Sequence, residues 1–123
     1  MPALTVLRKR ADFVLAAGSG FKCVKPSVII QLRKRTDKDI APASEIRVGF
    51  TATKTLGNAV VRNHTKRRMR AAAAKLVPEL GIPGCDYVFI GRASVSKGKF
   101  DTLLTDMRLC LKRLGSQIAE HPP

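Results

Sequence analysis

The segment from Asn58 to Val77, NAVVRNHTKRRMRAAAAKLV, constrains the fold of this chain most strongly. It is rich in alanine, it begins with an asparagine, a residue that caps helices well, and a proline follows it. These features predict one long α-helix over residues 58–77. Strands are predicted on both sides of this helix, because residues 46–53 alternate apolar and polar side chains and residues 85–91 form a short apolar run.

The remaining segments complete a small domain of mixed helices and strands. Helical spacing of apolar residues predicts a short first helix over residues 8–17 and an amphipathic last helix over residues 100–114. A β-branched run predicts a strand over residues 27–35, and turn-forming residues predict a loop over residues 37–45. Residues 1–7 are expected to be irregular and residues 115–123 to form a frayed tail. A chain of 123 residues is long enough for one core and too short for two, so residues 1–123 are predicted to form a single domain.

The charge balance indicates a polyanionic partner. There are 23 lysines and arginines against 9 acidic residues, which gives a formal net charge of +14. A hydrophobic content of 45% is typical of a folded domain, so the chain is not a disordered basic tail. The excess of positive charge is larger than solubility requires, and its usual use is to bind a polyanion.

The distribution of these charges is more informative than their number. No acidic residue occurs in residues 46–78, and cationic residues recur there at helical spacing. One side of the predicted helix, here called the basic stripe, carries Arg62, Asn63, Lys66, Arg67 and Arg70. A solvated helix face normally mixes charges of both signs, since like charges four residues apart repel, so the stripe favours phosphate binding. Smaller basic clusters occur at residues 8–10, at residues 33–35, and at Lys97 with Lys99.

Catalytic and metal-binding residues are scarce. Cys23, Cys85 and Cys110 form no CxxC pair and are interpreted as reduced thiols. The two histidines, His64 and His121, are too few for a catalytic or zinc constellation. The acidic residues are scattered, and no phosphate-binding loop motif occurs. The residues therefore predict a binding protein without a catalytic site of its own.

No segment suggests a membrane protein or a secreted one. No run reaches the roughly 18 apolar residues that a membrane span needs. In the N-terminal sequence MPALTVLRKR the charges follow the apolar stretch, which is the reverse of a secretory signal. A cytoplasmic protein is therefore expected.

Residues 54–70, KTLGNAVVRNHTKRRMR, closely resemble a family signature. The signature is K-x-x-G-x-A-V-x-R-N-x-x-K-R-x-x-R, which opens the central helix of the bacterial ribonuclease P protein subunit. The preceding RVGFTATK and the N-terminal LRKRADF are similar to the adjoining strand and first helix of that family, so the resemblance spans roughly residues 4–114.

The resemblance implies an α+β fold, a two-layer sandwich in the order α-β-β-β-α-β-α. Its mixed sheet has four strands and a left-handed β-α-β crossover, and the fold is related to one found in a ribosomal protein. Either GFKCV, before Pro26, or the far end of residues 27–35 must then supply the remaining strand.

The resemblance also implies a function. In this family an RNA subunit cuts the 5′ leader from precursor tRNA, using Mg²⁺ expected to be bound mainly by that RNA, and the protein is inactive alone. The implied partners are the catalytic RNA and the precursor tRNA leader, with no membrane and no small-molecule substrate. The candidate RNA-binding residues are Lys54, Arg62, Asn63, His64, Lys66, Arg67 and Arg70, together with the N-terminal cluster of Arg8, Lys9 and Arg10.

The candidate leader cleft contains Phe13, Ala17 and Gln31. Phe13 matches an aromatic residue of the family's first helix, but Ala17 and Gln31 stand where relatives often carry further aromatic residues. His64 likewise stands at the third position of the family's Arg-Asn-Arg core, where relatives carry an arginine. We therefore expect weaker stacking on leader bases, with Phe13 and electrostatic attraction contributing more of the contact.

Two other functions compete with this interpretation. A small ribosomal or general RNA-binding protein would have the same composition, and only the signature in the long helix argues against it. A basic amphipathic helix can also lie on anionic lipid, but the apolar strand over residues 85–91 and the absence of tryptophan argue against a lipid-binding protein.

Overall fold

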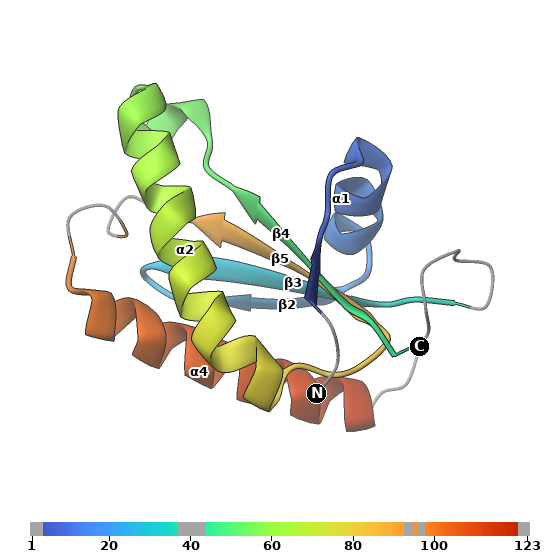
Figure 1. The fold of residues 1–123 in the computed structure, drawn as a ribbon. Coiled ribbons are helices and arrows are strands. Elements are labelled where there is room, and N and C mark those ends of the chain that lie inside the picture. Colours follow the sequence, from blue (N-terminus) through green and yellow to red (C-terminus); the bar gives the residue numbers. More distant parts are fainter. Residues whose placement is uncertain (1–3, 37–43, 93–94, 96–97, 121–123) are drawn as a thin grey trace.

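The computed structural model describes residues 4–36, 44–92, 95 and 98–120, and it shows a mixed sheet with helices on both faces (Figure 1). The α+β class is as predicted. The elements, in chain order, are β1 (Leu4–Val6), α1 (Arg10–Ala17), β2 (Phe21–Val24), β3 (Val28–Lys34), β4 (Ile46–Thr51), the 3₁₀ turn η1 (Lys54–Leu56), α2 (Ala59–Leu80), β5 (Cys85–Gly91) and α4 (Phe100–Glu120).

The sheet has the strand order β1-β4-β5-β3-β2. Strand β4 is parallel to both β1 and β5, whereas β3 is antiparallel to both β5 and β2. Helix α2 connects the neighbouring parallel strands β4 and β5. With α2 in front of the sheet, as in Figure 1, this crossover is left-handed, as the resemblance implied and opposite to the usual hand.

The main core lies between the sheet and the pair of helices α2 and α4. Its fully buried side chains include Ile30, Met69, Tyr87, Phe89 and Leu111. Successive side chains point to opposite faces of the sheet, so Tyr87 and Phe89 of β5 belong to this core, whereas Val88 and Ile90 lie on the other face.

A smaller cluster on the opposite face holds α1 against the sheet. Leu7, Ala16 and Val88 are buried there, and Phe13 and Ile90 pack against them. Because α1 has only 8 residues, it covers part of this face and leaves room for a pocket.

Helix α2 starts as predicted but ends later. The side chain of Asn58 accepts a hydrogen bond of 3.0 Å from the Val61 N–H and caps the helix. The predicted end at Val77 is wrong, since α2 continues through Pro78 to Leu80. Pro78 removes one hydrogen bond only in the last turn, where Leu80 packs against the core and the Gly81 N–H donates to the Val77 carbonyl at 2.7 Å.

The C-terminal helix is also longer than predicted. The prediction of a frayed tail over residues 115–123 is wrong for residues 115–120, because α4 continues to Glu120. Ile118 extends the buried side of the helix and is only 8% exposed, so the last turns have a packing reason to form. Residues 121–123 lie outside the described residues.

The N-terminal residues and the strand number differ from prediction as well. Residues 4–6 form β1, which pairs in parallel with Ile46–Val48, so the sheet has five strands rather than four. GFKCV does supply the strand that the sequence left open, since Phe21–Val24 forms β2. Helix α1 starts at Arg10 rather than at residue 8, and β4 ends at Thr51 rather than at residue 53.

Candidate nucleic-acid interface

The basic stripe forms on α2. Asn63, Arg67 and Arg70 are exposed, whereas Arg62 and Lys66 are half-buried. The buried side of the same helix consists of Thr65, Met69, Ala72, Ala73, Leu76 and Val77. The helical repeat therefore places the predicted RNA-binding residues on one side of α2 and the core-forming residues on another side.

The stripe borders the edge of the sheet formed by β4 and β1. The Arg70 guanidinium carbon lies 5.8 Å from the centre of the Phe50 ring of β4. Arg70 also forms part of the wall of a hollow of about 260 Å³ between β1, β4 and α2. Strand β1 ends opposite Val48, so in the described part of the chain no strand pairs with the outer edge of β4 beyond that residue.

Two other cations of α2 face α4 instead. Arg68 and Lys75 lie 5.7 Å and 5.8 Å from the centre of the Phe100 ring. Arg68 also donates a hydrogen bond of 2.9 Å to the carbonyl of Gly98. The sequence left the role of Arg68 open, and these contacts hold it against the protein.

Two predicted residues lie at the beginning of the stripe. Lys54 is exposed in η1, immediately before α2. The Nδ1 atom of His64 lies 3.3 Å from Nη2 of Arg67. These two nitrogen atoms lie within hydrogen-bonding distance, so His64 contacts an arginine of the stripe.

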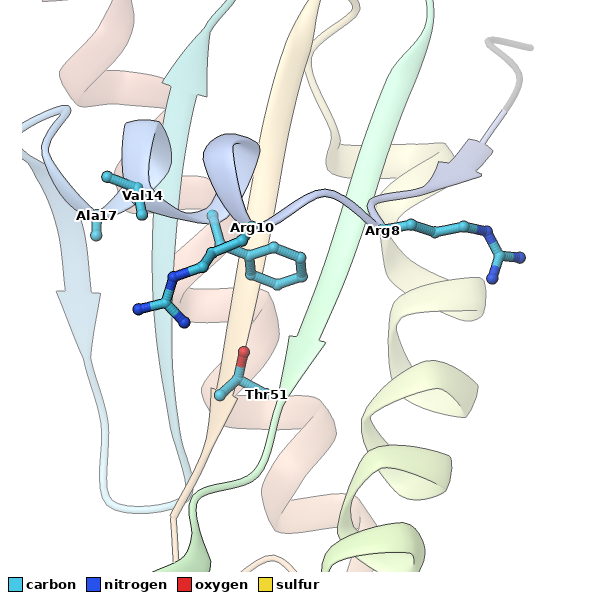
Figure 2. Close-up of a pocket in the computed structure, with 6 residues that line it drawn as sticks. Arg8, Arg10, Val14, Ala17 and Thr51 are labelled. Carbon is cyan, nitrogen blue, oxygen red and sulfur yellow. The ribbon is translucent and has the colours of Figure 1, made fainter.

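A pocket of about 480 Å³ lies between α1 and the sheet (Figure 2). The residues that line it are Arg8, Arg10, Phe13, Val14, Ala17 and Thr51. The structure thus places Phe13 and Ala17, both predicted for the leader cleft, in one pocket with two of the N-terminal cations. In Figure 2, the side chains of Arg10 and Arg8 extend in opposite directions. Sequence reasoning missed Val14 and Thr51, which only the packing of α1 on the sheet brings together.

Two predicted residues are not in this pocket. Gln31 is paired with Lys22 and Val88 in the neighbouring strands and lies on the α1 face of the sheet, but it is not among the lining residues. Lys9 lines a second, smaller pocket beside the start of α1, where Asp12 and Arg47 also lie.

Next to this second pocket, a buried carboxylate that sequence reasoning missed binds arginine side chains of the neighbouring strands. Asp86 of β5 is fully buried and accepts hydrogen bonds from Arg35 at 2.8 Å and from Arg47 at 2.6 and 2.8 Å. Arg33 approaches the same carboxylate to 3.7 Å. Arg47 also lies 3.4 Å from Asp12 of α1, so it ties this helix to the sheet. The sequence signal for this cluster was the position of Asp86, an acidic residue within the apolar run at 85–91.

Arg33 and Arg35 therefore have a different role from the one suggested by the basic cluster at residues 33–35. Both arginines lie against the buried Asp86, so part of their positive charge is offset within the protein. Only Lys34 of this cluster is exposed.

The described acidic residues do not fit a Mg²⁺ site. Asp12 and Asp86 are both paired with Arg47, and no group of three acidic, histidine or cysteine side chains in the described ranges could hold a metal ion. No helix in those ranges has both the length and the apolar character needed to cross a bilayer.

The cysteines are free and buried, in agreement with their interpretation as thiols. Burial raises the pKa of the Cys85 thiol from its ordinary value of 9.0 to about 11. Burial also raises the pKa values of Cys110 and Tyr87 well above their ordinary range. These groups are consequently neutral at physiological pH and belong to the core.

Comparison with known proteins assigns the chain to a family. The family model described as ribonuclease P matches residues 1–115. The chain is 48% identical over 117 residues to the ribonuclease P protein component of Ruegeria pomeroyi, with 90% of this chain and 86% of that protein covered. It is 44% identical over 112 residues to the ribonuclease P protein component of Caulobacter vibrioides, with 91% and 72% covered.

Solved structures agree with these matches. The RNase P protein from Thermotoga maritima superposes with a TM-score of 0.71 at 26% identity, covering 87% of this chain and 94% of that one. The Staphylococcus aureus RNase P protein gives a TM-score of 0.70 at 24% identity, with 88% and 93% covered, and it supports the fold. The signature helix, the sheet topology and these matches agree, and the chain belongs to the ribonuclease P protein family.

Proposed function

We propose that this protein binds the catalytic RNA of ribonuclease P through the basic stripe and holds the 5′ leader of precursor tRNA in the pocket between α1 and the sheet. It thereby promotes Mg²⁺-dependent removal of the leader, while the RNA subunit carries out the chemistry. The observation that supports this most strongly is the meeting of the two surfaces at one strand. In β4, Phe50 lies against Arg70 of the stripe, and the next residue, Thr51, lines the pocket.

The stripe acts by neutralising phosphates. Each neutralised phosphate releases condensed counterions, and the binding constant therefore falls as the salt concentration rises. Arginine guanidinium groups can pair with two phosphate oxygens at once, and Asn63 adds an exposed neutral donor and acceptor within the stripe. Protein cations between two RNA molecules lower the Mg²⁺ concentration that their assembly requires.

The pocket suits single-stranded RNA. Phe13 offers an aromatic wall, Val14 and Ala17 offer apolar contacts, and Arg8 and Arg10 can bind phosphates on either side of an unstacked base. Ala17 leaves Phe13 as the aromatic side chain of this pocket, so stacking on leader bases depends on that ring.

The chemistry of cleavage is assigned to the RNA. Asp12 and Asp86 are held by Arg47, and the described residues offer no cluster of acids that could bind Mg²⁺. The contribution of this chain is to position the leader relative to the RNA subunit and to reduce the repulsion between the two RNAs.

The test is leader cleavage at low Mg²⁺. Precursor tRNA is incubated with the cognate RNA subunit, with and without this protein, and with the protein alone. We expect the protein to stimulate cleavage by the RNA subunit and to cleave nothing by itself. General RNA binding without stimulation would contradict the proposal and favour a ribosomal type of function.

A further inference from the structure

Gly49 of β4 lies directly against the ring of Phe13. A Cβ atom at position 49 would be 2.7 Å from both Cε1 and Cζ of Phe13, and 3.2 Å from Cβ of Leu7. Carbon atoms in van der Waals contact are separated by about 3.5–4.0 Å, so a methyl group at this position would displace the ring. The far end of Phe13 reaches the strand because residue 49 has no side chain.

The backbone at Gly49 does not itself require glycine. The described glycines with positive φ are Gly20, Gly57 and Gly84, whereas Gly49 is paired regularly with Val88 of β5. Glycine weakens the interior of a strand and often marks a close approach of another group. Here the approaching group is the Phe13 ring.

We propose that Gly49 is a positioning residue for leader recognition, because it seats Phe13 at the depth where its ring forms the wall of the pocket. This inference rests on the proposed function of the pocket. A side chain at position 49 would push the ring outward into the space that Arg10 and Thr51 also line. The base would then lose both its stacking surface and part of its room.

The test is a double-mutant cycle in which the contribution of the leader to precursor tRNA binding is measured. Holoenzymes are assembled with the wild-type protein, Gly49→Ala, Phe13→Ala and the double variant. For each one, the Kd for precursor tRNA is compared with the Kd for mature tRNA, and their ratio measures the contribution of the leader. Contacts of the stripe with the RNA subunit affect both Kd values and cancel in this ratio.

We expect Phe13→Ala to reduce the leader contribution about tenfold, which is within the range for removal of one base–aromatic stack. Gly49→Ala should reduce it by several-fold, and the double variant should resemble Phe13→Ala alone. Two residues that act through the same contact are not additive.

Gly91→Ala is the matched control. A Cβ at Gly91 would clash with Thr65 and approach Met69 to 3.2 Å, but these side chains belong to α2, on the other face of the sheet. We expect this variant to lose thermal stability as Gly49→Ala does, without any change in the leader contribution.

Several outcomes would overturn the inference. Gly49→Ala could fold and keep the full leader contribution, its effect could add to that of Phe13→Ala, or Gly91→Ala could reduce the leader contribution equally. If Gly49→Ala fails to fold, folding of the double variant supports the inference, because removal of the Phe13 ring then relieves the clash. Failure of both variants to fold contradicts the inference. A wild-type holoenzyme that binds precursor and mature tRNA equally would instead contradict the proposed function itself.

Discussion

At the scale of single residues, Asp86 shows how charge can be structural in a strongly basic protein. Its side chain is fully buried, and the paired side chains of Arg35 and Arg47 are only 3% and 14% exposed. Removing one partner of a buried ion pair leaves the other charge buried without compensation. The resulting loss of folding free energy is larger than the net stabilisation that the pair provides. A charge count cannot distinguish such arginines from those that remain available to RNA.

Replacement of Asp86 by asparagine should therefore destabilise the protein strongly. We expect Asp86→Asn to lower the free energy of unfolding by about 3–5 kcal/mol, because Arg35 and Arg47 lose their counter-charge. Urea denaturation followed by circular dichroism would measure this decrease.

The control for this prediction is the exposed pair of Glu79 and Arg108. Their charged atoms are 3.9 Å apart, with side chains 65% and 45% exposed. Glu79→Gln should cost less than about 1 kcal/mol. Similar decreases for the two variants would show that the group around Asp86 does not support the fold.

At the scale of elements, α2 separates its cations between two surfaces. Arg70 borders β4, whereas Arg68 and Lys75 lie against Phe100 of α4. A helix in the crossover between two adjacent strands can thus anchor itself on one side and present phosphate-binding residues on the other.

The stripe should therefore be separable from the fold. We expect Arg62→Ala with Lys66→Ala to weaken binding to the RNA subunit and to reduce the slope of log K against log salt. The reduction should be about 0.7–0.9 for each phosphate that the variant no longer neutralises. The measurement is a salt titration of binding, with circular dichroism to verify that α2 is intact.

Lys112→Ala with Arg113→Ala provides the same change of charge on α4, where both side chains are exposed. This control should keep nearly the wild-type slope. Equal slopes for the two double variants would mean that the stripe attracts RNA only through net charge.

Prediction from the sequence succeeded for elements whose signal is local. The alternation in β4, the apolar run of β5 and the cap at Asn58 were sufficient to predict the strand, the helix and the strand that form the crossover, whereas its left hand was implied only by the resemblance. Strand β1 was missed because its side chains are exposed and its stabilisation comes from pairing with Ile46–Val48, far away in the sequence. The end of α2 was missed because the packing of its last turn outweighs the tendency of proline to end a helix.

The candidate site divides in the same way. Helical periodicity was sufficient to assemble the basic stripe. The pocket depends on the packing of α1 on the sheet, which neither α1 nor the strands specify alone, so Thr51 and Gly49 could be recognised as residues of the site only in the structure.

At the scale of the whole molecule, ionisable side chains are built into the main core. Cys85 and Tyr87 of β5 and Cys110 of α4 are all fully buried. Their neutral forms are favoured by burial, so the native state retains protons that the unfolded chain releases at alkaline pH.

Stability should accordingly decline with rising pH. The pKa of Cys85 is about 11 in the folded protein against 9.0 ordinarily, so its contribution is complete below pH 9 and disappears as the pH rises toward 11. We expect the difference in unfolding free energy between wild type and Cys85→Ala to shrink across this window, by about 1.4 kcal/mol for each unit by which the two pKa values differ.

Denaturation at several pH values in high salt, which screens the lysine charges, would measure this difference. A difference that stays constant from pH 9 to 11 would contradict the burial of the Cys85 thiol.

The three enclosed thiols also make the protein a convenient carrier for spectroscopic probes. A thiol-specific dye needs access to the sulfur atom, and Cys23, Cys85 and Cys110 are all buried. A single cysteine introduced at an exposed position such as Ser116 of α4 would therefore be modified selectively in the otherwise native sequence. Assembly with RNA could then be followed by fluorescence without altering the core.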